Sequence, residues 1–313
     1  PMFIEGGNED DRNQSDLTEA RWQVERTPIT LADVGGLAAV KERLEVSFLA
    51  PLRHPKLRRL YRKNLRGGLL LYGPPGCGKT FIARALAGEL EASFLHLAIN
   101  DVLDMFVGMS ERNLHNLFGA ARRNVPCVVF MDEIDALGRR RSQLQDYAAL
   151  RTTVNQLLLE LDGAEDSNEG VFVLAATNHP WDVDPALRRP GRFDRMLLVT
   201  PPDREAREVI FRKNLEERPI ASIALATLAA RSEGLSGADI AYVCETAAEK
   251  AMIDSVRRGE PRLIEMDDLE AALREVKPST RAWFETVRNV LEFANTSGEY
   301  DELREYMRTR RLL

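Results

Sequence analysis

Gly73-Pro74-Pro75-Gly76-Cys77-Gly78-Lys79-Thr80 is the stretch of this 313-residue sequence that decides the fold. It fits the phosphate-binding pattern G-x-x-x-x-G-K-[ST] and lies between an apolar run, 68–72, and a helix-like segment, 81–86. The glycines let backbone N–H groups turn toward an anion, and the positive end of the following helix adds to that attraction. Lys79 would reach the β- and γ-phosphates of a nucleotide, and Thr80 would ligate Mg²⁺. The alternative, a glycine-rich turn before a lysine, is disfavoured by the strand–loop–helix context.

Composition indicates a soluble globular protein, because 44% of the residues are hydrophobic and 29% are charged. The length predicts about two domains. No apolar stretch is long enough to span a membrane and the first residues lack signal-peptide features, so we expect no membrane segment in this chain. A chain that begins with Pro1 leaves open a further N-terminal adaptor or anchor region. The three widely spaced cysteines fit neither a disulfide framework nor a zinc site and favour a reducing, cytoplasmic location.

Five short apolar runs predict the strands of an α/β domain, and they lie at 69–72, 94–99, 127–131, 171–176 and 196–199. The first four are separated by segments with room for a helix, which favours a parallel five-stranded sheet flanked by helices. After the consecutive prolines Pro201 and Pro202 only helical patterns follow. We therefore predict a flexible lead-in over 1–27, a large α/β nucleotide-binding domain over 28–202, a small all-helical domain over 203–278 and a C-terminal helical extension over 279–313.

Two acidic residues follow the apolar run that ends at Met131. At such a strand end Asp132 would hold Mg²⁺ and its waters, while Glu133 would orient and deprotonate the attacking water. Asn178 follows the next strand along the chain, and its neutral amide could position water without adding negative charge. The alternatives are a pair of acids that opens a loop and an asparagine that serves a turn.

Two arginines flank a Pro-Gly turn at residues 190–191. Their guanidinium groups, on Arg189 and Arg192, could reach the phosphate of a neighbouring subunit. On spacing alone the alternative is favoured, in which these are surface arginines paired with Asp184 or Asp194.

Six motifs in this order resemble the AAA family of ATPases, in the clade of valosin-containing protein, katanin and spastin. They are 33–36, 73–80, 128–135, 176–178, 184–194 and 237–239, and the resemblance covers roughly residues 30–278. It implies an α/β domain with a helical lid, assembled as a hexameric ring of identical subunits with ATP between them. The residues implied to bind ATP are Asp33, Val34, Gly35, Pro74, Pro75, Gly76, Cys77, Gly78, Lys79, Thr80, Phe81, Gly237 and Ala238.

The same resemblance implies roles for the remaining candidates. Thr80 and Asp132 would hold Mg²⁺, Glu133 would be the catalytic acid of the Walker B pair, and Asn178 resembles sensor 1. Arg189 and Arg192 resemble arginine fingers that act on the neighbouring subunit.

A segment after the second strand, Met105-Phe106-Val107, resembles the first pore loop of the family. An aromatic side chain facing a ring's channel can grip extended polypeptide without reading its sequence. Without the family, Phe106 would be interpreted as a core residue. Residues 138–145 correspond loosely to a second pore loop. Two departures stand out: Gly108-Met109-Ser110 lacks the acid that is common after the pore aromatic, and Asn214 falls where some relatives carry a histidine.

These observations favour a protein-remodelling ATPase that threads polypeptide through a central pore. The alternative is a nucleic-acid-directed motor or loader that uses the basic segments 53–66 and 139–141, although the formal charge of −6 and the lack of aromatic partners make nucleic acid an unlikely ligand. A third hypothesis is a scaffold that binds ATP but scarcely turns it over. A smaller hypothesis is that Cys77, beside a helix N-terminus, has a lowered pKa and makes the ATPase sensitive to thiol reagents. The alternative, an unreactive small residue in a tight loop, is somewhat favoured.

Overall fold

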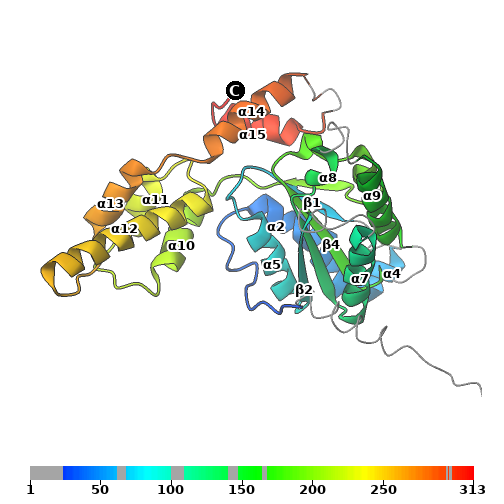
Figure 1. Ribbon diagram of the computed structural model, residues 1–313, viewed down its shortest axis with the longest axis horizontal. Helices are drawn as coiled ribbons and strands as arrows, with labels where there is room; N and C mark the ends of the chain where they lie inside the picture. Colours follow the sequence, from blue (N-terminus) through cyan, green and yellow to red (C-terminus); the bar gives the residue numbers. More distant parts are fainter. Residues whose placement is uncertain are drawn as a thin grey trace, which may run out of the picture. The chain divides into compact units, whose positions relative to one another are not determined.

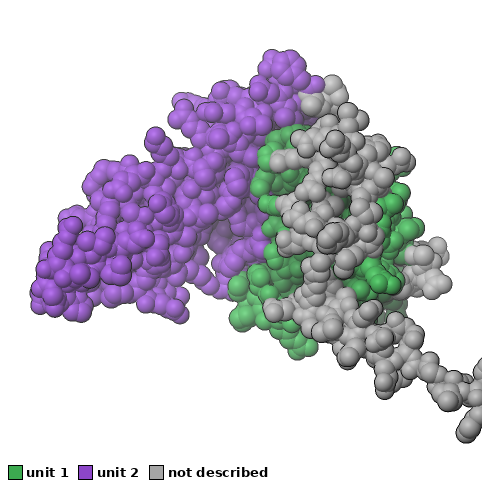
Figure 2. All heavy atoms as spheres, in the orientation of Figure 1, with its two compact units in different colours: residues 1–29, 51–70, 83–196 green, residues 30–50, 71–82, 197–313 purple. Residues whose placement is uncertain are grey.

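The computed structural model describes residues 24–61, 68–99, 109–139, 147–163, 168–293, 295 and 298–313. The chain forms two compact units, drawn in different colours in Figure 2. The first unit consists of residues 1–29, 51–70 and 83–196, and the second of residues 30–50, 71–82 and 197–313. The domain boundaries predicted at residues 27, 202 and 278 stay predictions.

The predicted parallel sheet is confirmed, with five strands in the order β2-β3-β4-β1-β5. The strands are β1 (Leu69–Tyr72), β2 (Ser93–Ala98), β3 (Cys127–Asp132), β4 (Val171–Thr177) and β5 (Arg195–Leu198). Every residue of β1 and of β4 is buried, which explains why these strands read as unbroken apolar runs rather than as alternating ones. Strands β2 and β3 pair in parallel, and so do β3 and β4, where Met131 lies opposite Ala175.

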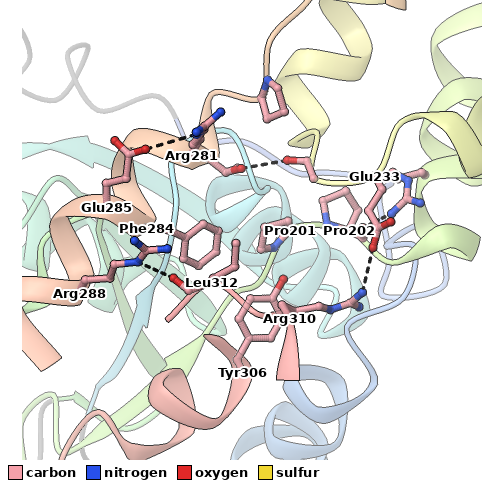
Figure 3. A pocket seen from close by; sticks show the side chains of 14 residues that line it. Pro201, Pro202, Glu233, Arg281, Phe284, Glu285, Arg288, Tyr306, Arg310 and Leu312 are labelled. Carbon is pink, nitrogen blue, oxygen red and sulfur yellow. Dashed lines mark hydrogen bonds and ion pairs between the residues drawn. The ribbon is translucent and has the colours of Figure 1, made fainter. Parts of the chain in front are cut away.

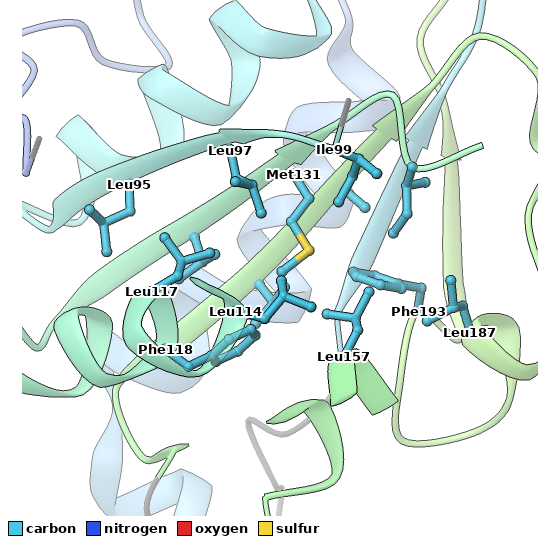
Figure 4. Close-up of a cluster of buried hydrophobic side chains, with 14 of the residues drawn as sticks. Leu95, Leu97, Ile99, Leu114, Leu117, Phe118, Met131, Leu157, Leu187 and Phe193 are labelled. Atoms are coloured by element: carbon cyan, nitrogen blue, oxygen red, sulfur yellow. The ribbon is translucent and has the colours of Figure 1, made fainter. Parts of the chain in front are cut away.

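Helices accompany the strands, and two of them, α7 and α9, carry the predicted periodicity. In chain order they are α3 (Ala50–Arg53), α4 (Pro55–Leu60), α5 (Lys79–Glu89), α7 (Met109–Arg123), α8 (Ala136–Arg139) and α9 (Tyr147–Asp162). In the first unit, one face of α7 and one face of α9 enter a core with the inward side chains of the strands, as Figure 4 shows for Leu114, Phe118, Leu157 and Met131. The apolar residues of α7 and α9 recur at helical intervals, and this pattern predicted the buried faces from the sequence.

The N-terminal lead-in differs from the expectation at its end. Residues 1–23 lie outside the described part of the chain, but Glu25 forms an antiparallel bridge with Phe94 of β2, with N···O distances of 3.0 and 2.8 Å. Its carboxylate also pairs with Arg84. These bonds hold the segment that follows residue 23 on the edge strand, where unpaired backbone groups are available.

The second unit begins with α2 (Ala38–Leu44), which continues into a π-helical turn (Glu45–Leu49), and it contains the predicted helical domain. Its helices are α10 (Arg204–Leu215), α11 (Leu225–Arg231), α12 (Gly237–Arg258) and α13 (Met266–Glu275), which share one apolar core (Figure 1). Polar caps define their starts: Asp203 Oδ1 accepts from the Ala206 N–H at 2.8 Å, and Ser236 forms a reciprocal capping box with Asp239. Gly259 ends α12 in the left-handed conformation.

Two further helices, α14 (Thr280–Phe293) and α15 (Asp301–Thr309), complete the second unit and confirm the helical expectation for the end of the chain. Their aromatic side chains pack together: the rings of Phe284, which is buried, and Tyr306, which is half-buried, are stacked with centroids 6.0 Å apart. Within the described ranges, no helix combines the length and the apolar character needed to cross a bilayer.

Two helical glycines should respond to alanine in opposite directions. A Cβ on Gly88 would lie 1.9 Å from the backbone oxygen of Ile29, so Gly88→Ala has to displace that segment and should cost about 1–3 kcal/mol. A Cβ on Gly119 would meet only the flexible end of Arg123 at 3.5 Å, so Gly119→Ala should stabilise by about 0.5–1 kcal/mol. The midpoints of urea unfolding of the two variants and of the unmodified chain check both signs; a stabilising Gly88→Ala would contradict the packing described above.

Candidate active site

The phosphate loop of the second unit leaves β1 at Gly73 and ends where α5 begins at Lys79. Gly73 and Gly76 have φ values of 150° and 73°, which side-chain-bearing residues rarely adopt. A Cβ on Gly73 would lie 2.1 Å from the Val199 carbonyl oxygen, and one on Gly76 would lie 2.8 Å from Ser236 Oγ. Only glycine therefore permits this close approach of the loop to its neighbours.

Lys79 is buried and its ammonium group lies over the loop. Its Nζ donates to the carbonyl oxygens of Gly73 at 2.9 Å and Pro74 at 2.8 Å. Backbone donors at the start of a helix, glycines that expose them and an ammonium group at the same place form a set of donors suited to phosphate. The residues present thus fit the phosphates of a nucleotide.

A mostly apolar cavity of about 320 Å³ opens beside this loop in the second unit. This volume lies at the small end of the range usual for ligand pockets. Nine of the predicted ATP-binding residues line it: Asp33, Val34, Gly35, Gly76, Cys77, Gly78, Phe81, Gly237 and Ala238. Pro74, Pro75, Lys79 and Thr80 do not line it and lie in the phosphate loop and the first turn of α5 instead. The cavity is therefore suited to the base and sugar of a nucleotide.

Helix α10 supplies a wall of this cavity, of which the sequence analysis noted only Asn214, where some relatives carry a histidine near the ribose. The lining residues not predicted to bind ATP are Leu37, Ile82, Thr200, Pro202, Val209, Ile210, Lys213 and Asn214. One face of a helix carries positions 209, 210, 213 and 214, so helical periodicity could have grouped them. Apart from the resemblance at Asn214, no sequence pattern predicted that this face lies beside the phosphate loop.

An ion pair fixes the segment that carries Asp33 against α10. Lys213 Nζ donates to Asp33 Oδ1 at 2.6 Å, and the backbone N–H of Thr30 donates to Oδ2 at 2.9 Å. The hydrogen bond from Lys213, followed by that from Thr30, lowers the pKa of Asp33 below its ordinary value. Asp33 is therefore a charged anchor of the cavity wall rather than a neutral contact to a base.

The N-terminus of α12 is joined directly to the phosphate loop. The Ala238 N–H donates to the Gly76 carbonyl oxygen at 3.2 Å. Ser236 caps the helix, and Asp239 Oδ2 accepts from both the N–H and the Oγ of Ser279, at 3.1 and 3.0 Å. Loop, helical domain and the start of the C-terminal helices thus form one hydrogen-bonded chain.

The hypothesis of a reactive Cys77 is wrong, and the favoured alternative of an unreactive residue agrees with the structure. Its thiol is buried, and burial raises the pKa of Cys77 to about 12, a larger effect than the opposing one of Lys79. The Sγ atom lies 3.7 Å from the Pro75 carbonyl oxygen. Position at a helix N-terminus is therefore not sufficient to activate this thiol, because desolvation of the thiolate outweighs the helix dipole.

The carboxylates lie in the first unit, at the end of β3. The β3–β4 register places Met131 opposite Ala175, so continuing it brings Asp132, Glu133 and Asn178 to the same edge of the sheet. Asp132 is half-buried and its Oδ1 accepts from the Glu133 N–H at 2.9 Å. Glu133 is exposed and has a φ of 56°, a conformation that costs a non-glycine residue about 1–3 kcal/mol and that clusters at functional sites.

A hydrogen-bonded pair joins the loop after β3 to the end of β4. Thr177 Oγ1 donates to Asp135 Oδ1 at 2.6 Å, and the His179 N–H donates to Thr177 Oγ1 at 2.8 Å. The Ile134 N–H donates to the Ala176 carbonyl oxygen at 3.1 Å. These bonds hold the residues on both sides of Asn178, and neither Asp135 nor Thr177 was singled out as a support in the sequence.

The two arginines differ in what surrounds them. Arg189 is exposed, whereas Arg192 donates from Nε and Nη2 to the two carboxylate oxygens of Asp162 at 2.8 and 2.7 Å, and from Nη1 to the Ala186 carbonyl oxygen at 2.8 Å. The Asp162 hydrogen bonds raise the pKa of Arg192 and lower that of Asp162. Of the expected partners, Asp184 accepts from the backbone N–H of Ala186 and Asp194 from that of Gly191, both at 2.9 Å. Asp184 also contributes, less than Asp162, to the raised pKa of Arg192.

Asp162 lies thirty positions before Arg192 at the end of α9, and no local signal connected the two. The predicted pore-loop residues Met105, Phe106 and Val107 lie outside the described residues, as does 140–145 of the second candidate pore loop.

Comparison with known proteins agrees with the fold and with these residues. Residues 69–201 match the ATPase family associated with various cellular activities (AAA), and residues 222–271 match the AAA+ lid domain. The chain therefore belongs to the AAA+ ATPases, with an ATP-binding AAA domain followed by a helical lid. This confirms the resemblance noted in the sequence.

Individual relatives come from two groups. The ATP-dependent zinc metalloprotease FtsH 3 of Sphaerobacter thermophilus is 41% identical over 273 residues, or 87% of this chain and 54% of that protein. FtsH 1 of Symbiobacterium thermophilum is 44% identical over 242 residues, or 76% and 40%. The cell division cycle protein 48 homolog of Archaeoglobus fulgidus is 39% identical over 267 residues, or 82% and 36%. The matched region spans about half or less of each relative's length.

Cys77 should resist alkylation in the folded chain. With a pKa of about 12, roughly one thiol in ten thousand is ionised at pH 8, and little of the side chain is exposed to reagents. We expect iodoacetamide to modify Cys77 at least about 100-fold more slowly in the native chain than in urea, with the difference shrinking only when the chain unfolds. Peptide mass spectrometry separates Cys77 from Cys127 and Cys244, which are also buried. Rapid labelling of native Cys77 would instead support the hypothesis of a reactive thiol.

Proposed function

We propose that this chain hydrolyses ATP with Mg²⁺ in a ring of identical subunits, most simply a hexamer, and that hydrolysis draws polypeptide through the central pore of the ring. The observation that carries the proposal is the apolar cavity beside a phosphate loop whose glycines and Lys79 are arranged for an anion. Membership of the AAA+ ATPases supports the same reaction.

Each candidate residue has a chemical task in this proposal. Lys79 would neutralise phosphate charge and Thr80 would offer a hydroxyl to Mg²⁺. Asp132 is the carboxylate suited to the ion, since Mg²⁺ prefers oxygen ligands and completes its shell with water and substrate phosphates. When bound, the ion would neutralise charge that develops on the transferred phosphoryl group. Among the residues that the structure describes, no group of three or more His, Cys, Asp or Glu side chains could hold a metal ion unaided.

The attacking water would be handled at the edge of the sheet. Glu133, exposed and in a strained conformation, would orient this water and accept its proton, while the Asn178 amide would hydrogen-bond it without adding negative charge. The bonds of Asp135 and Thr177 support this geometry by holding the backbone on either side of Asn178. We assign them as positioning residues.

Arg189 is the stronger candidate for a finger that acts on a neighbouring subunit, because it is exposed. Arg192 has both ends of its guanidinium engaged by Asp162 and could reach another subunit only by giving up that pair. Within one subunit, Arg192 instead stabilises the turn that presents Arg189. The need for a finger from a second subunit is the physical reason to propose a ring.

A polypeptide substrate is supported by the relatives. The name metalloprotease, carried by two of the relatives described above, denotes an enzyme that acts on proteins. We propose that Phe106, with Met105 and Val107, contacts a translocating chain from the pore side of each subunit. An apolar aromatic grip would not read sequence, which suits varied clients.

A nucleic-acid motor has less support. In the basic segment 53–66, Arg53 pairs with Glu89 at 2.6 Å and Arg58 pairs with Glu169 at 2.8 Å, so part of its charge is neutralised within the first unit. The formal charge of −6 adds no general attraction to a polyanion. The free, buried cysteines at 77, 127 and 244 fit the reducing, cytoplasmic setting that we propose for the protein.

Turnover should depend on Arg189 from a second subunit. Arg189→Ala is expected to lower the ATPase rate by about 10³-fold or more without abolishing ATP binding, because a finger acts on charge that develops during transfer. Arg192→Ala should act indirectly, with a smaller loss accompanied by a lowered unfolding midpoint. Steady-state phosphate release, nucleotide titration and thermal unfolding separate the two effects.

Mixing provides the control for action between subunits. Glu133→Gln subunits hydrolyse no ATP of their own but still supply Arg189, so mixing them with Arg189→Ala subunits should restore part of the activity. Specific activity of the unmodified chain should also rise with protein concentration. Failure of the mixture to recover, or full activity from a proven monomer, would refute the trans arrangement.

Threading should depend on the aromatic ring of Phe106. Phe106→Ala should slow unfolding of a degron-tagged fluorescent protein severely while ATP hydrolysis continues, because the ring grips substrate and does not touch nucleotide. Phe106→Tyr is the matched control and should keep most of the unfolding rate. If Phe106→Ala unfolds the client as fast as the unmodified chain, this segment is not the gripping loop, whatever the ATPase rate.

A further inference from the structure

A second cavity, of about 480 Å³, lies in the second unit and has no role in the function proposed above. Its walls come from the two prolines before α10, Arg207 of α10, the turn after α11, the helices α14 and α15 and the residues that follow α15. It shares only Pro202 with the nucleotide cavity. Its volume lies within the range of small-molecule pockets. Neither family model that matches this chain covers α14 or α15, which begin after residue 271.

Part of the wall of this cavity is apolar and aromatic. Figure 3 shows the rings of Phe284 and Tyr306 and the side chains of Pro201 and Leu312 facing the same space. The two rings are stacked with an interplanar angle of 22°, and Phe284 is almost fully buried. Parallel aromatic faces beside a proline favour a planar apolar group over a branched one.

The rim of the cavity carries an excess of positive charge. Four arginines line it against two glutamates, in a chain whose overall formal charge is −6. Two arginines are neutralised by those glutamates: Arg310 lies 3.3 Å from Glu233, and Arg281 lies 3.3 Å from Glu285. Figure 3 shows Arg288 and Arg310 approaching the space from opposite sides.

The other two arginines have only carbonyl oxygens as hydrogen-bond acceptors among the described residues. Arg207, which is buried, donates to the Ala229 carbonyl oxygen at 2.9 and 2.7 Å and to that of Pro202 at 3.0 Å. Arg288 donates from Nε to the Leu312 carbonyl oxygen at 2.5 Å, which leaves its Nη groups for another acceptor. The nearby carboxylates of Glu233 and Asp203 offset part of the Arg207 charge. The lining still contains two more arginines than glutamates, so its net charge is positive.

We propose that this cavity is a binding site for a small organic anion with a planar, apolar body and a carboxylate, sulfonate or phosphate group. The ring system would lie against Phe284 and Tyr306, and the anionic group would accept hydrogen bonds from the Nη atoms of Arg288. Arg207, a buried residue of the cavity lining, adds positive charge to the site. A neutral ligand of the same shape would leave these charges unbalanced and should bind less well.

Naphthalene-2-sulfonate tests the proposal directly, with the near-isosteric but neutral naphthalene-2-sulfonamide as its partner. Titration calorimetry of the full chain should show one site for the anion and roughly tenfold weaker binding of the sulfonamide, because charge-assisted hydrogen bonds are lost. Both titrations are run with saturating ADP and Mg²⁺, because the nucleotide cavity is also apolar and shares Pro202. Binding that disappears when ADP is present would place the probe in the nucleotide cavity and overturn the proposal.

Matched arginine variants locate the site. Arg288→Gln should weaken binding of the anion roughly tenfold and leave the sulfonamide unchanged, since only the anion uses that charge. Arg308→Gln removes an exposed arginine of α15 that does not line the cavity, and it should change neither affinity. Arg288 is exposed, so its substitution should not impair folding, and equal unfolding midpoints would verify this. Equal affinities of the two probes, equal effects of the two variants, or no binding at millimolar probe would each refute the assignment.

Discussion

The close approach of the phosphate loop to its neighbours is the constraint on which the second unit depends. Gly73 lies against the Val199 carbonyl and Gly76 against Ser236, at distances that leave no room for a Cβ. The Ala238 N–H then bonds the Gly76 carbonyl, so the loop, the strand end and the lid helix are adjusted to one another. A movement of Gly76 has to be transmitted to the start of α12, because no slack exists at these contacts. The phosphate loop thus also connects β1 to the start of α12.

In the first unit, the candidate site residues are brought together by strand pairing. Parallel pairing of β3 with β4 brings their carboxyl ends to one edge, and the Asp135–Thr177 hydrogen bond holds the loops that follow. Glu133 sits there in a left-handed conformation that the surrounding bonds have to maintain. Arg192, tied to Asp162, braces the turn that leaves Arg189 exposed. Hydrogen bonds fix the positions of the residues at this edge of the sheet, whereas burial of the apolar strands stabilises the sheet itself.

The C-terminal helices give the second unit a further surface. They pack Phe284 on Tyr306 and bring arginines from α10, α14 and the chain end around one cavity. Helix α10 serves both cavities, since Arg207 faces this one while Ile210 and Lys213 line the nucleotide cavity.

Local sequence patterns predicted the strands, two of the helices and the phosphate loop. Unbroken apolar runs located all five strands, helical periodicity located α7 and α9, and the 73–80 loop identified the phosphate site, because these signals depend on neighbours within one or two turns. The sequence left the reactivity of Cys77 open, because the desolvation that raises its pKa depends on atoms brought from elsewhere in the chain. The Asp33–Lys213 and Arg192–Asp162 pairs and the cavity at α14 and α15 were likewise decided by tertiary structure alone. Such contacts join residues far apart in sequence, and only folding sets the distances at which charge and burial act.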